Sequence, residues 1–530
     1  MKKHSRILAL VFAVLMMISA LYGCTQQAVA STGEQSGDNG SATAAASQKD
    51  TLVVLSAEAF SGSWDPGSHT VLANCHLQWV VLSNLLNKNY DTGEIGPGLA
   101  TEWEFLDDGY SVQFKLRDDV TFHDGSTFDG YDVKATIEHM SDPKGTRGGD
   151  WGQQYLVDVI DPYTVRIYPS SETPQAIILN MLSLTGILSA DDVANPEKLK
   201  SGLNGTGPYK MEKYENETVY LTRFENYYDK ADMAKIKNVE YRYVPESQTR
   251  LAALQSGEAD LIDRVETEQL EIVKADPNLA YVVGNVNEQK YMVFKTTQAP
   301  MDNPLVRKAI AYAIDVDTIV NDIMNGYARK ADSWLPASAA NYTACEDFIT
   351  YDVEKAKALL VEAGYPNGEG LPTLKYITST GFYPKTKEYG EYIVSCLNEI
   401  GIQVDFQPME SAGWSEALYQ EDSCHMIDTG WMNESNEDNI ALYVCYHTTG
   451  LMDFSSNADV DAALLHETAT MDAAARKQVI HDELWPALNA NMSTFPLFDS
   501  TCIYVYNAAL QGFKVLPTSS MSFWQYSFEG

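Results

Sequence analysis

The sequence predicts an α/β protein with more than one domain. Its 530 residues exceed the roughly 250 to 300 residues at which a single hydrophobic core stops growing. Hydrophobic residues make up 45% of the chain and aromatic residues 11%, a composition typical of globular rather than disordered proteins. From Thr51 onward, helical and strand patterns alternate, and this alternation favours α/β layers.

Strand patterns dominate the first part of this alternation. Runs rich in β-branched and aromatic residues predict strands at 51–58, 110–122, 163–169, 218–224 and 239–244. Between them, "FDGYDVKATIEHM" predicts a helix over 128–140. Asp129 is placed to cap this helix, and Asp132 three residues later favours its positive end. A further helix is expected over 174–184.

Helices and strands alternate more regularly in the second part. Gly205, Gly207 and Pro208 predict a turn, and an amphipathic helix from 247 stops at Gly257 before a short strand. Helices follow over 304–324, 352–364 and 387–401, and strands over 371–379 and 402–409. The sequence contains no internal repeat.

Charge and motif content argue against several functions. The formal net charge of -36 would repel a phosphate backbone, so nucleic acid is not an expected partner. The "HETAT" stretch at His466 lacks the second histidine of a zinc hydrolase, and no GxSxG or GxxxxGK[ST] sequence occurs. His481, in "HDELW", fits an exposed helix face. We therefore expect no enzyme activity, no cofactor and no metal.

Six cysteines follow Cys24, and none belongs to a CxxC pair, so neither a zinc knuckle nor a redox motif is indicated. Disulfides and buried unpaired thiols both remain open. The six are Cys75, Cys345, Cys396, Cys424, Cys445 and Cys502.

The N-terminus has the pattern of an export signal. Lys2, Lys3 and Arg6 precede an apolar run over 7–21 and the sequence "LYGC". This run is short for a membrane span, although an uncleaved anchor is the alternative. Residues 24–50 are rich in Gly, Ser, Ala and Thr and predict a flexible tether with a reach of about 28 Å.

Eight stretches in order along the chain resemble the family 5 extracellular solute-binding proteins, the dipeptide, oligopeptide and nickel-binding components of ABC importers. They are "SWDPGSH", "GPGLATEWEFLDDGYSVQFKLRDDVTFHDGSTFDGYDV", "NGTGPYKM", "ENYYDK", "LAALQSGEADLI", "VRKAIAYAIDVDTIV", "DVEKAKALLVEAGYPNG" and "DTGWMNESNEDN". Together they extend over nearly the whole chain after Thr51.

The resemblance implies an α/β, two-lobed fold like that of the periplasmic binding proteins, of type II, cluster C. Lobe I would comprise 51–293 and 501–530, with an extra subdomain at about 85–203. Lobe II would comprise 294–500. Hinge strands are expected near "YMVFKT" and "FPLFDSTCIYV", because hinges absorb large changes of φ and ψ while each lobe moves as a rigid body.

The sequence from Leu21 to Cys24 resembles a bacterial lipobox. The resemblance implies cleavage after residue 23 and lipid modification of Cys24. The mature protein would then be a membrane-anchored, outward-facing lipoprotein, extracellular or periplasmic, and we expect a monomer.

Trp431 is the first candidate for a ligand contact. An aromatic face attracts a cation, and nearby Asp428 and Glu434 add negative potential. In peptide-binding members of the family, an acidic residue three positions after this tryptophan meets the ligand's α-ammonium group, and Glu434 stands there. The backbone of Gly430 to Met432 could pair with an extended peptide. The alternative is a core tryptophan beside a solvated acidic loop.

Other candidates depend on position alone. Trp414 occupies a place where relatives can have a second pocket aromatic, and Trp334 is a third aromatic candidate. Phe60 and Ser61 follow the first strand, where relatives begin the opposite wall of the cleft. Packing is the alternative for the two tryptophans. The histidines of "FHDG" and near Trp431 (His123, His425 and His447) are expected to be structural.

The function implied is capture of a small solute, with peptides as the first expectation, and its delivery to ABC permease and ATPase subunits. Alternatives are a nickel chelate, a sugar or another amine-bearing molecule, or an extracellular sensor with the same fold.

Overall fold

The structure is a computed structural model that describes residues 49–68, 72–90, 94–145, 151, 153–171, 178–380, 383–433, 438–448, 450, 452 and 454–529. All of them belong to the compact unit Gln48–Gly530. The predicted signal peptide, Cys24 and nearly all of the tether lie outside the described residues, and so does Glu434. None of the described helices is both long enough and apolar enough to span a bilayer.

Within the described residues, one 11-stranded sheet has the strand order β15-β14-β16-β12-β17-β11-β1-β10-β9-β8, with β13 paired to β17. Its strands are β1 (Thr51–Ser56), β8 (Tyr209–Glu215), β9 (Thr218–Arg223), β10 (Asn238–Tyr243), β11 (Leu261–Ile262), β12 (Leu279–Phe294), β13 (Ala328–Lys330), β14 (Leu374–Thr380), β15 (Val404–Glu410), β16 (Met426–Met432) and β17 (Thr494–Asn507).

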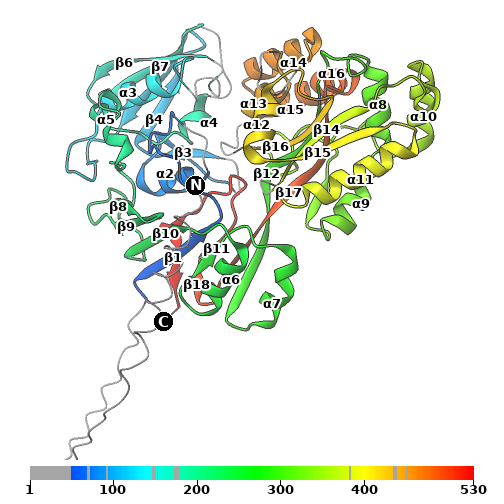
Figure 1. Cartoon of the computed structure of the whole chain (residues 1–530). Coiled ribbons are helices and arrows are strands. Elements are labelled where there is room, and N and C mark those ends of the chain that lie inside the picture. Colours follow the sequence, from blue (N-terminus) through cyan, green and yellow to red (C-terminus); the bar gives the residue numbers. More distant parts are fainter. Residues whose placement is uncertain are drawn as a thin grey trace, which may run out of the picture. The chain divides into compact units, whose positions relative to one another are not determined.

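The two longest strands, β12 and β17, connect the two halves of this sheet (Figure 1). They pair antiparallel from Leu279 opposite Asn507 to Val293 opposite Thr494. In one half of the sheet, β17 pairs with β11. In the other half, from Glu288 onward, β12 also pairs with β16. Two register shifts, between Asn285 and Gln289 and between Lys290 and Tyr291, lie at this passage. Such irregularities bend a strand locally.

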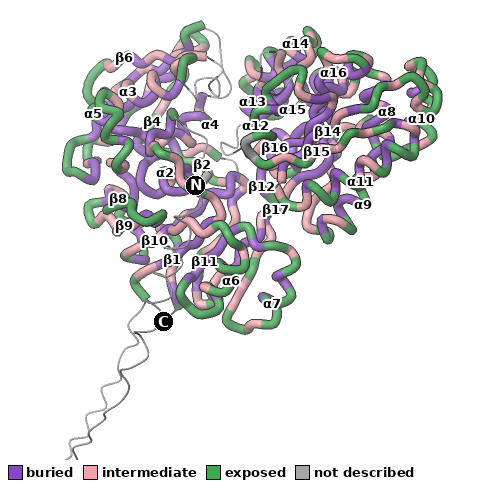
Figure 2. Tube along the Cα trace, in the orientation of Figure 1, coloured by how far each residue is buried: buried purple, intermediate pink, exposed green. Residues whose placement is uncertain are grey.

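The hydrophobic core of the described residues divides at the same place. One cluster takes its buried members from 291–498. The others take theirs from 52–273 and 503–528, apart from Ile440 and Val444. We call the half around the first cluster lobe II and the half around the others lobe I. In Figure 2 the sheet strands at both centres are mostly buried, and many outer helices alternate between buried and exposed residues.

Lobe I contains a second, four-stranded sheet and most of the shorter elements. This sheet has the order β4-β5-β7-β6. Its strands are β4 (Ala100–Phe105), β5 (Val112–Leu116), β6 (Tyr155–Asp161) and β7 (Thr164–Pro169). The other lobe I elements are β2 (Leu86–Lys88), β3 (Ile95–Pro97), β18 (Leu510–Gln511), β19 (Ser527–Phe528), α2 (Leu72–Val81), α3 (Gly130–Met140), α4 (Ile178–Leu182), α5 (Ala190–Ala194), α6 (Ser247–Gln255) and α7 (Leu270–Ala275).

The start of α3 confirms the predicted capping of this helix. The Asp129 carboxylate accepts a hydrogen bond from the Tyr131 backbone N–H at 2.8 Å, and the Asp132 carboxylate accepts one from the Asp129 N–H at 2.9 Å. Two otherwise unpaired donors at the helix start are thereby satisfied.

The helices of lobe II cover the sheet formed by β14, β15 and β16. They are α8 (Pro304–Ala313), α9 (Val316–Thr318), α10 (Val353–Glu362), α11 (Thr386–Glu399), α12 (Ser411–Tyr419), α13 (Asp438–Tyr446), α14 (Ala458–Ala469), α15 (Ala473–Val479) and α16 (Trp485–Asn491). The prediction of one helix over 304–324 was wrong. Ile314 is extended, and the Asp315 side chain caps a new helix by accepting from the Thr318 N–H at 3.2 Å.

The glycines of "GTGPY" have a packing role. A Cβ on Gly205 would lie 1.9 Å from the Val81 carbonyl oxygen, and the Gly207 N–H donates to the same oxygen at 2.9 Å. The turn therefore packs directly against the end of α2. His123 lies beside it, with Nε2 2.9 Å from the Gly207 carbonyl oxygen, and burial lowers the pKa of this histidine to about 4.

Candidate functional site

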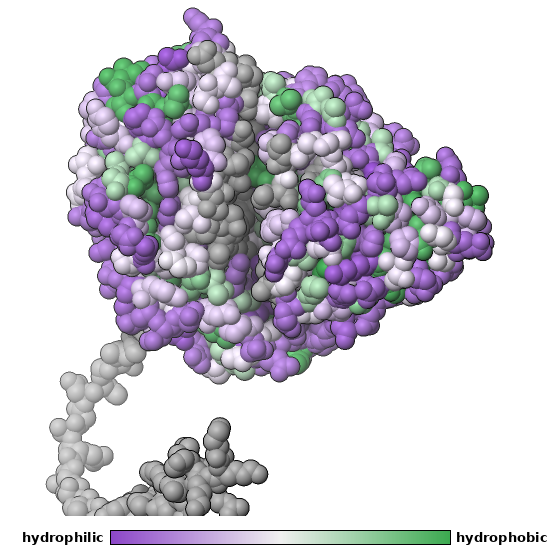
Figure 3. Space-filling view, turned by 45° about the horizontal axis from the view of Figure 1, so that its top comes forward, coloured by the Kyte–Doolittle hydropathy of each residue, from purple (hydrophilic) through white to green (hydrophobic). Residues whose placement is uncertain are grey.

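A cavity of about 1330 Å³ is lined by residues of both lobes. Lobe I contributes side chains that include Glu58, His76 and Arg264, and lobe II contributes Tyr383, Trp414 and Trp431. In Figure 3 the surface around the hollow between the two halves is mostly hydrophilic. A cavity enclosed by two lobes can surround a bound molecule on several sides.

Trp431 lies at the end of β16, opposite Gln289 of β12. Its half-buried ring packs against the core clusters of both lobes, and it lines the large cavity. Among the described residues its Nε1 atom has no hydrogen-bond partner. The predicted aromatic is thus at the place where the lobes and the cavity meet.

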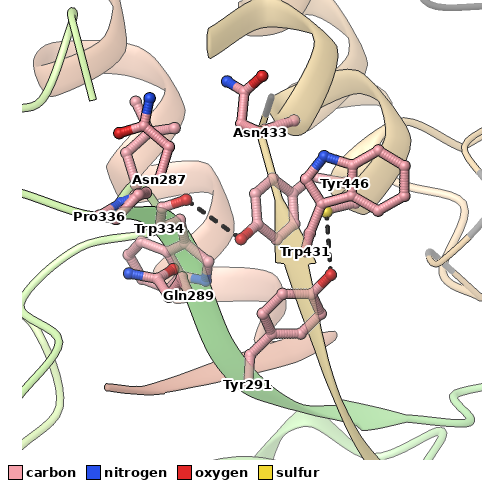
Figure 4. A pocket seen from close by; sticks show the side chains of 11 residues that line it. Asn287, Gln289, Tyr291, Trp334, Pro336, Trp431, Asn433 and Tyr446 are labelled. Atoms are coloured by element: carbon pink, nitrogen blue, oxygen red, sulfur yellow. Dashed lines mark hydrogen bonds between the residues drawn. The ribbon is translucent and has the colours of Figure 1, made fainter. Parts of the chain in front are cut away.

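A second cavity of about 20 Å³ adjoins the first at Trp431 and Asn433, which line both. Figure 4 shows Gln289, Trp334 and Tyr446 around it. The Tyr446 hydroxyl donates to the Trp334 carbonyl oxygen at 3.2 Å and fixes two of its walls. The space is sufficient for about one water molecule or a small polar group.

Asp428 does not face either cavity. The side chain is fully buried, accepts a hydrogen bond from Tyr376 at 3.1 Å and another from Tyr389. Burial raises the pKa of this carboxyl group. The expected contribution of Asp428 to a ligand-facing acidic surface therefore needs correction, because Tyr376 and Tyr389 hold its carboxylate in the core of lobe II.

Trp414 and Trp334 have different surroundings. Trp414 lines the large cavity, donates from Nε1 to the Asp428 carbonyl oxygen at 3.0 Å and meets the Tyr383 ring edge-on at 5.8 Å. Trp334 is 2% exposed, lines only the small cavity and packs against Trp485. Both tryptophans thus combine packing with a place on a cavity wall.

Phe60 and Ser61 line neither cavity. Phe60 packs against the aromatic rings of Trp64, Tyr214 and Tyr241, and the Ser61 hydroxyl donates to the Ser63 carbonyl oxygen. The residues just before them, 57–59, line the large cavity instead. Gly430 and Met432 line it too. The described residues leave the predicted contact of Glu434 untested.

The sequence did not single out Lys290, which lies opposite Gly430 on β12 and lines the large cavity. It is 2% exposed, and its Nζ lies 3.0 Å from the centroid of the Tyr383 ring. A Cβ on Gly430 would approach the lysine Cδ to 2.9 Å, so the glycine leaves room for this side chain. Burial lowers the pKa of Lys290 to about 8, although Asp428 and Glu288 raise it.

Charged residues also connect the two lobes across the cavity. Lys385, at the start of α11 in lobe II, forms an ion pair with Glu268 of lobe I. The Asn325 amide donates to the Thr267 hydroxyl at 3.1 Å beside it. Arg264 and Glu58, both of lobe I, approach to 3.7 Å. Lys385 and Arg264 thus have acidic neighbours within 4 Å.

Comparison with known families settles the class of protein. The model of the bacterial extracellular solute-binding proteins, family 5 Middle, matches residues 94–453. The chain belongs to this family. The predicted family resemblance is thus confirmed, and the family is one of solute-binding proteins, not of enzymes.

Individual relatives of this solute-binding protein support the same fold. The glutathione-binding protein GsiB of Pectobacterium atrosepticum is 28% identical over 442 residues, which cover 80% of this chain and 84% of GsiB. DppA from Helicobacter pylori in complex with the peptide STSA is 24% identical, with a TM-score of 0.78 over 91% of this chain and 99% of DppA.

A second solved structure has a different ligand. NikZ from Campylobacter jejuni in complex with Ni(L-His) is 22% identical, with a TM-score of 0.78 over 90% of this chain and 99% of NikZ. These structures confirm the predicted two-lobed fold of the periplasmic binding proteins.

Proposed function

We propose that this solute-binding protein captures a short peptide between its lobes and presents it to the permease of an ABC importer. The observation that carries the proposal is the cavity of about 1330 Å³ lined by both lobes with Trp431 on its wall. Pockets for small drug-sized ligands measure about 300 to 1,000 Å³. The larger cavity favours an extended ligand with several rotatable bonds.

The end of β16 supports a peptide ligand. β16 pairs with β14 only through Met426 and Ile427, while its other edge follows β12 to Met432. Among the described strands, none takes the β14-side edge beyond Ile427. The Tyr383 hydroxyl bonds to Gly430 there. An extended peptide that takes the place of the Tyr383 hydroxyl could add to this edge through backbone hydrogen bonds, which would bind many sequences alike.

Glu434 is the proposed partner of the peptide's α-ammonium group. It stands three residues after Trp431 and directly after Asn433 in the sequence, and Trp431 and Asn433 both line the cavity. A carboxylate accepts charge-assisted hydrogen bonds from an ammonium group, and these strengthen when closure excludes water. Relatives that bind glutathione or the peptide STSA have ligands with such a group.

Closure around the ligand would use β12 and β17. We place the lobes at 51–293 with 501–530 and at 294–500, joined by these two strands. The two register shifts, between Asn285 and Gln289 and between Lys290 and Tyr291, are the points at which the strands would bend. The Lys385–Glu268 ion pair would then hold the closed form.

Native mass spectrometry of the full chain purified from rich medium tests the proposed function. We expect the protein to retain a series of short peptides, which denaturation releases for identification. A single non-peptide mass, such as a nickel chelate or a sugar, would contradict the peptide proposal within the same family. A retained ligand without an amine would remove Glu434 from the proposed site.

We also propose that the protein is a lipoprotein anchored through Cys24, on the basis of its export-signal pattern and lipobox-like sequence. Replacing Cys24 with serine should release the protein from the membrane, because the thiol that receives the lipid is lost. Fractionation of cells that express each form measures this. Equal membrane retention of the serine variant would contradict the anchor.

A further inference from the structure

We propose that Lys290 binds a carboxylate of the ligand, so that the captured solute is acidic or zwitterionic. This inference deepens the proposed function by naming a chemical group of the ligand and the residue that would recognise it. It rests on that function only in assuming that the large cavity holds the ligand.

The first observation is an ammonium group without an acceptor. Among the described residues, the Lys290 Nζ atom is buried and has no hydrogen-bond partner. A buried charge without a partner is costly, so buried lysines are normally paired or bonded. The Tyr383 ring below it contributes a cation–π contact, but it provides no oxygen that accepts the N–H groups in this geometry.

A nearby lysine shows how the same fold satisfies a buried ammonium group. Lys295 is completely buried just after the end of β12, and its Nζ donates to the Leu418 carbonyl oxygen at 2.6 Å. Burial lowers its pKa to about 8, as it does that of Lys290. Lys295 does not line the cavity, whereas Lys290 does. The difference points to an acceptor for Lys290 that arrives with the ligand.

The neighbouring acidic groups do not fill this role. Asp428 already accepts hydrogen bonds from two tyrosines, and Glu288 accepts one from the Ser500 hydroxyl at 2.6 Å. Both carboxyl groups favour the charged form of Lys290 at a distance, but among the described residues neither forms an ion pair with it. They keep the lysine cationic at neutral pH and leave its N–H groups unused.

The position allows contact with a ligand. Lys290 lies directly opposite Gly430, and the next pair along the two strands is Gln289 and Trp431. Gly430 has no side chain to cover the ammonium group, and the Tyr383 ring beside it also lines the cavity. In this structure Nζ is buried, so contact with a ligand carboxylate would use a rotation about the flexible lysine stem. The proposed carboxylate would therefore lie beside Gly430 and the Tyr383 ring.

The test compares trialanine with its C-terminal amide by isothermal titration calorimetry. Full-length wild-type protein, freed of retained ligand by reversible denaturation, should bind the free acid about 10- to 100-fold more tightly than the amide, the range of one charge-assisted hydrogen bond. Lys290→Met should bind both peptides with the weaker affinity. Lys290→Arg, which preserves the charge, should recover part of the preference.

Lys295→Met is the matched control, because it removes an equally buried lysine outside the cavity. It should retain the wild-type preference for the acid. A Lys290→Met protein that retains this preference would overturn the inference and leave the proposed function intact. If the wild-type protein binds neither trialanine nor its amide, and if its retained ligands carry no acidic group, both the role of Lys290 and the proposed peptide-binding function are contradicted. Melting curves of each variant show that it is folded.

Discussion

Replacing Glu467 with alanine is expected to lower the free energy of unfolding by about 3 to 5 kcal/mol. Glu467 is fully buried on α14 and forms an ion pair with Arg476 of α15, which is 4% exposed. It also accepts a hydrogen bond from the Asn439 amide of α13 at 2.9 Å. The alanine variant would remove the Glu467 carboxylate from the buried Arg476 guanidinium, and removal of one member of a buried ion pair is strongly destabilising.

Urea denaturation of the wild type and the variant measures this loss. The control is Glu483→Ala, because the exposed carboxylate of Glu483 lies 3.0 Å from His466 on the surface. Exposed ion pairs contribute at most about 1 kcal/mol. Equal midpoints for both variants would show that the Glu467 pair does not hold the three helices together. Since α13 begins shortly after Trp431, a loosened α13 should also weaken ligand binding.

Lys290→Met is expected to raise the free energy of unfolding of the ligand-free protein by about 3 kcal/mol at pH 7. The fall of the Lys290 pKa from 10.5 to about 8 means that folding disfavours the charged ammonium group by this amount. Methionine has a similar length and no charge, so it removes the cost of burial.

The effect should depend on pH in a defined direction. In the wild type, the free-energy cost of burying the charged Lys290 is fully present below about pH 8, where the lysine of the folded protein is still protonated. It shrinks as the pH rises from about 8 to 10.5, because the unfolded chain retains its proton over this range while the folded protein releases it. The stability difference between the two proteins should therefore decrease above pH 8, as followed by urea denaturation at a series of pH values.

A difference that stays constant across this range would show that Lys290 has an ordinary pKa. Lys295→Met is again the control. Its ammonium group donates to the Leu418 carbonyl oxygen, so the variant leaves that acceptor unpaired. The gain at neutral pH should consequently be smaller than for Lys290→Met.

Local signals in the sequence were sufficient for most elements of the fold. The capping pair of Asp129 and Asp132 predicted the start of α3, and Gly364 and Gly401, both with positive φ, mark the ends of two predicted helices. The break after Ala313 was missed, because the capping role of Asp315 depends on its side-chain geometry. Apolar periodicity continues across the break and conceals it.

The candidate site could be predicted only in part. Trp431 was found because an aromatic residue in an acidic stretch is unusual, and it lines both cavities. The burial of Asp428 depends on which face of β16 points to the core, and that is set by pairing with distant strands. Lys290 and Gly430 are far apart in the chain, and only the pairing of β12 with β16 brings them into contact. No pattern within one stretch reveals such a pair.

The contact between Gly430 and Lys290 also limits how the protein can diverge. A side chain at position 430 would collide with the lysine stem, since its Cβ would lie 2.9 Å from Cδ. Substitutions at positions 290 and 430 therefore depend on each other, although the two residues lie on separate strands. A larger residue at 430 therefore requires either a displaced lysine stem or a shorter residue at 290, and the shorter residue removes the cation. When residue 290 is shortened, steric exclusion would thus couple a substitution at 430 to a change in ligand preference.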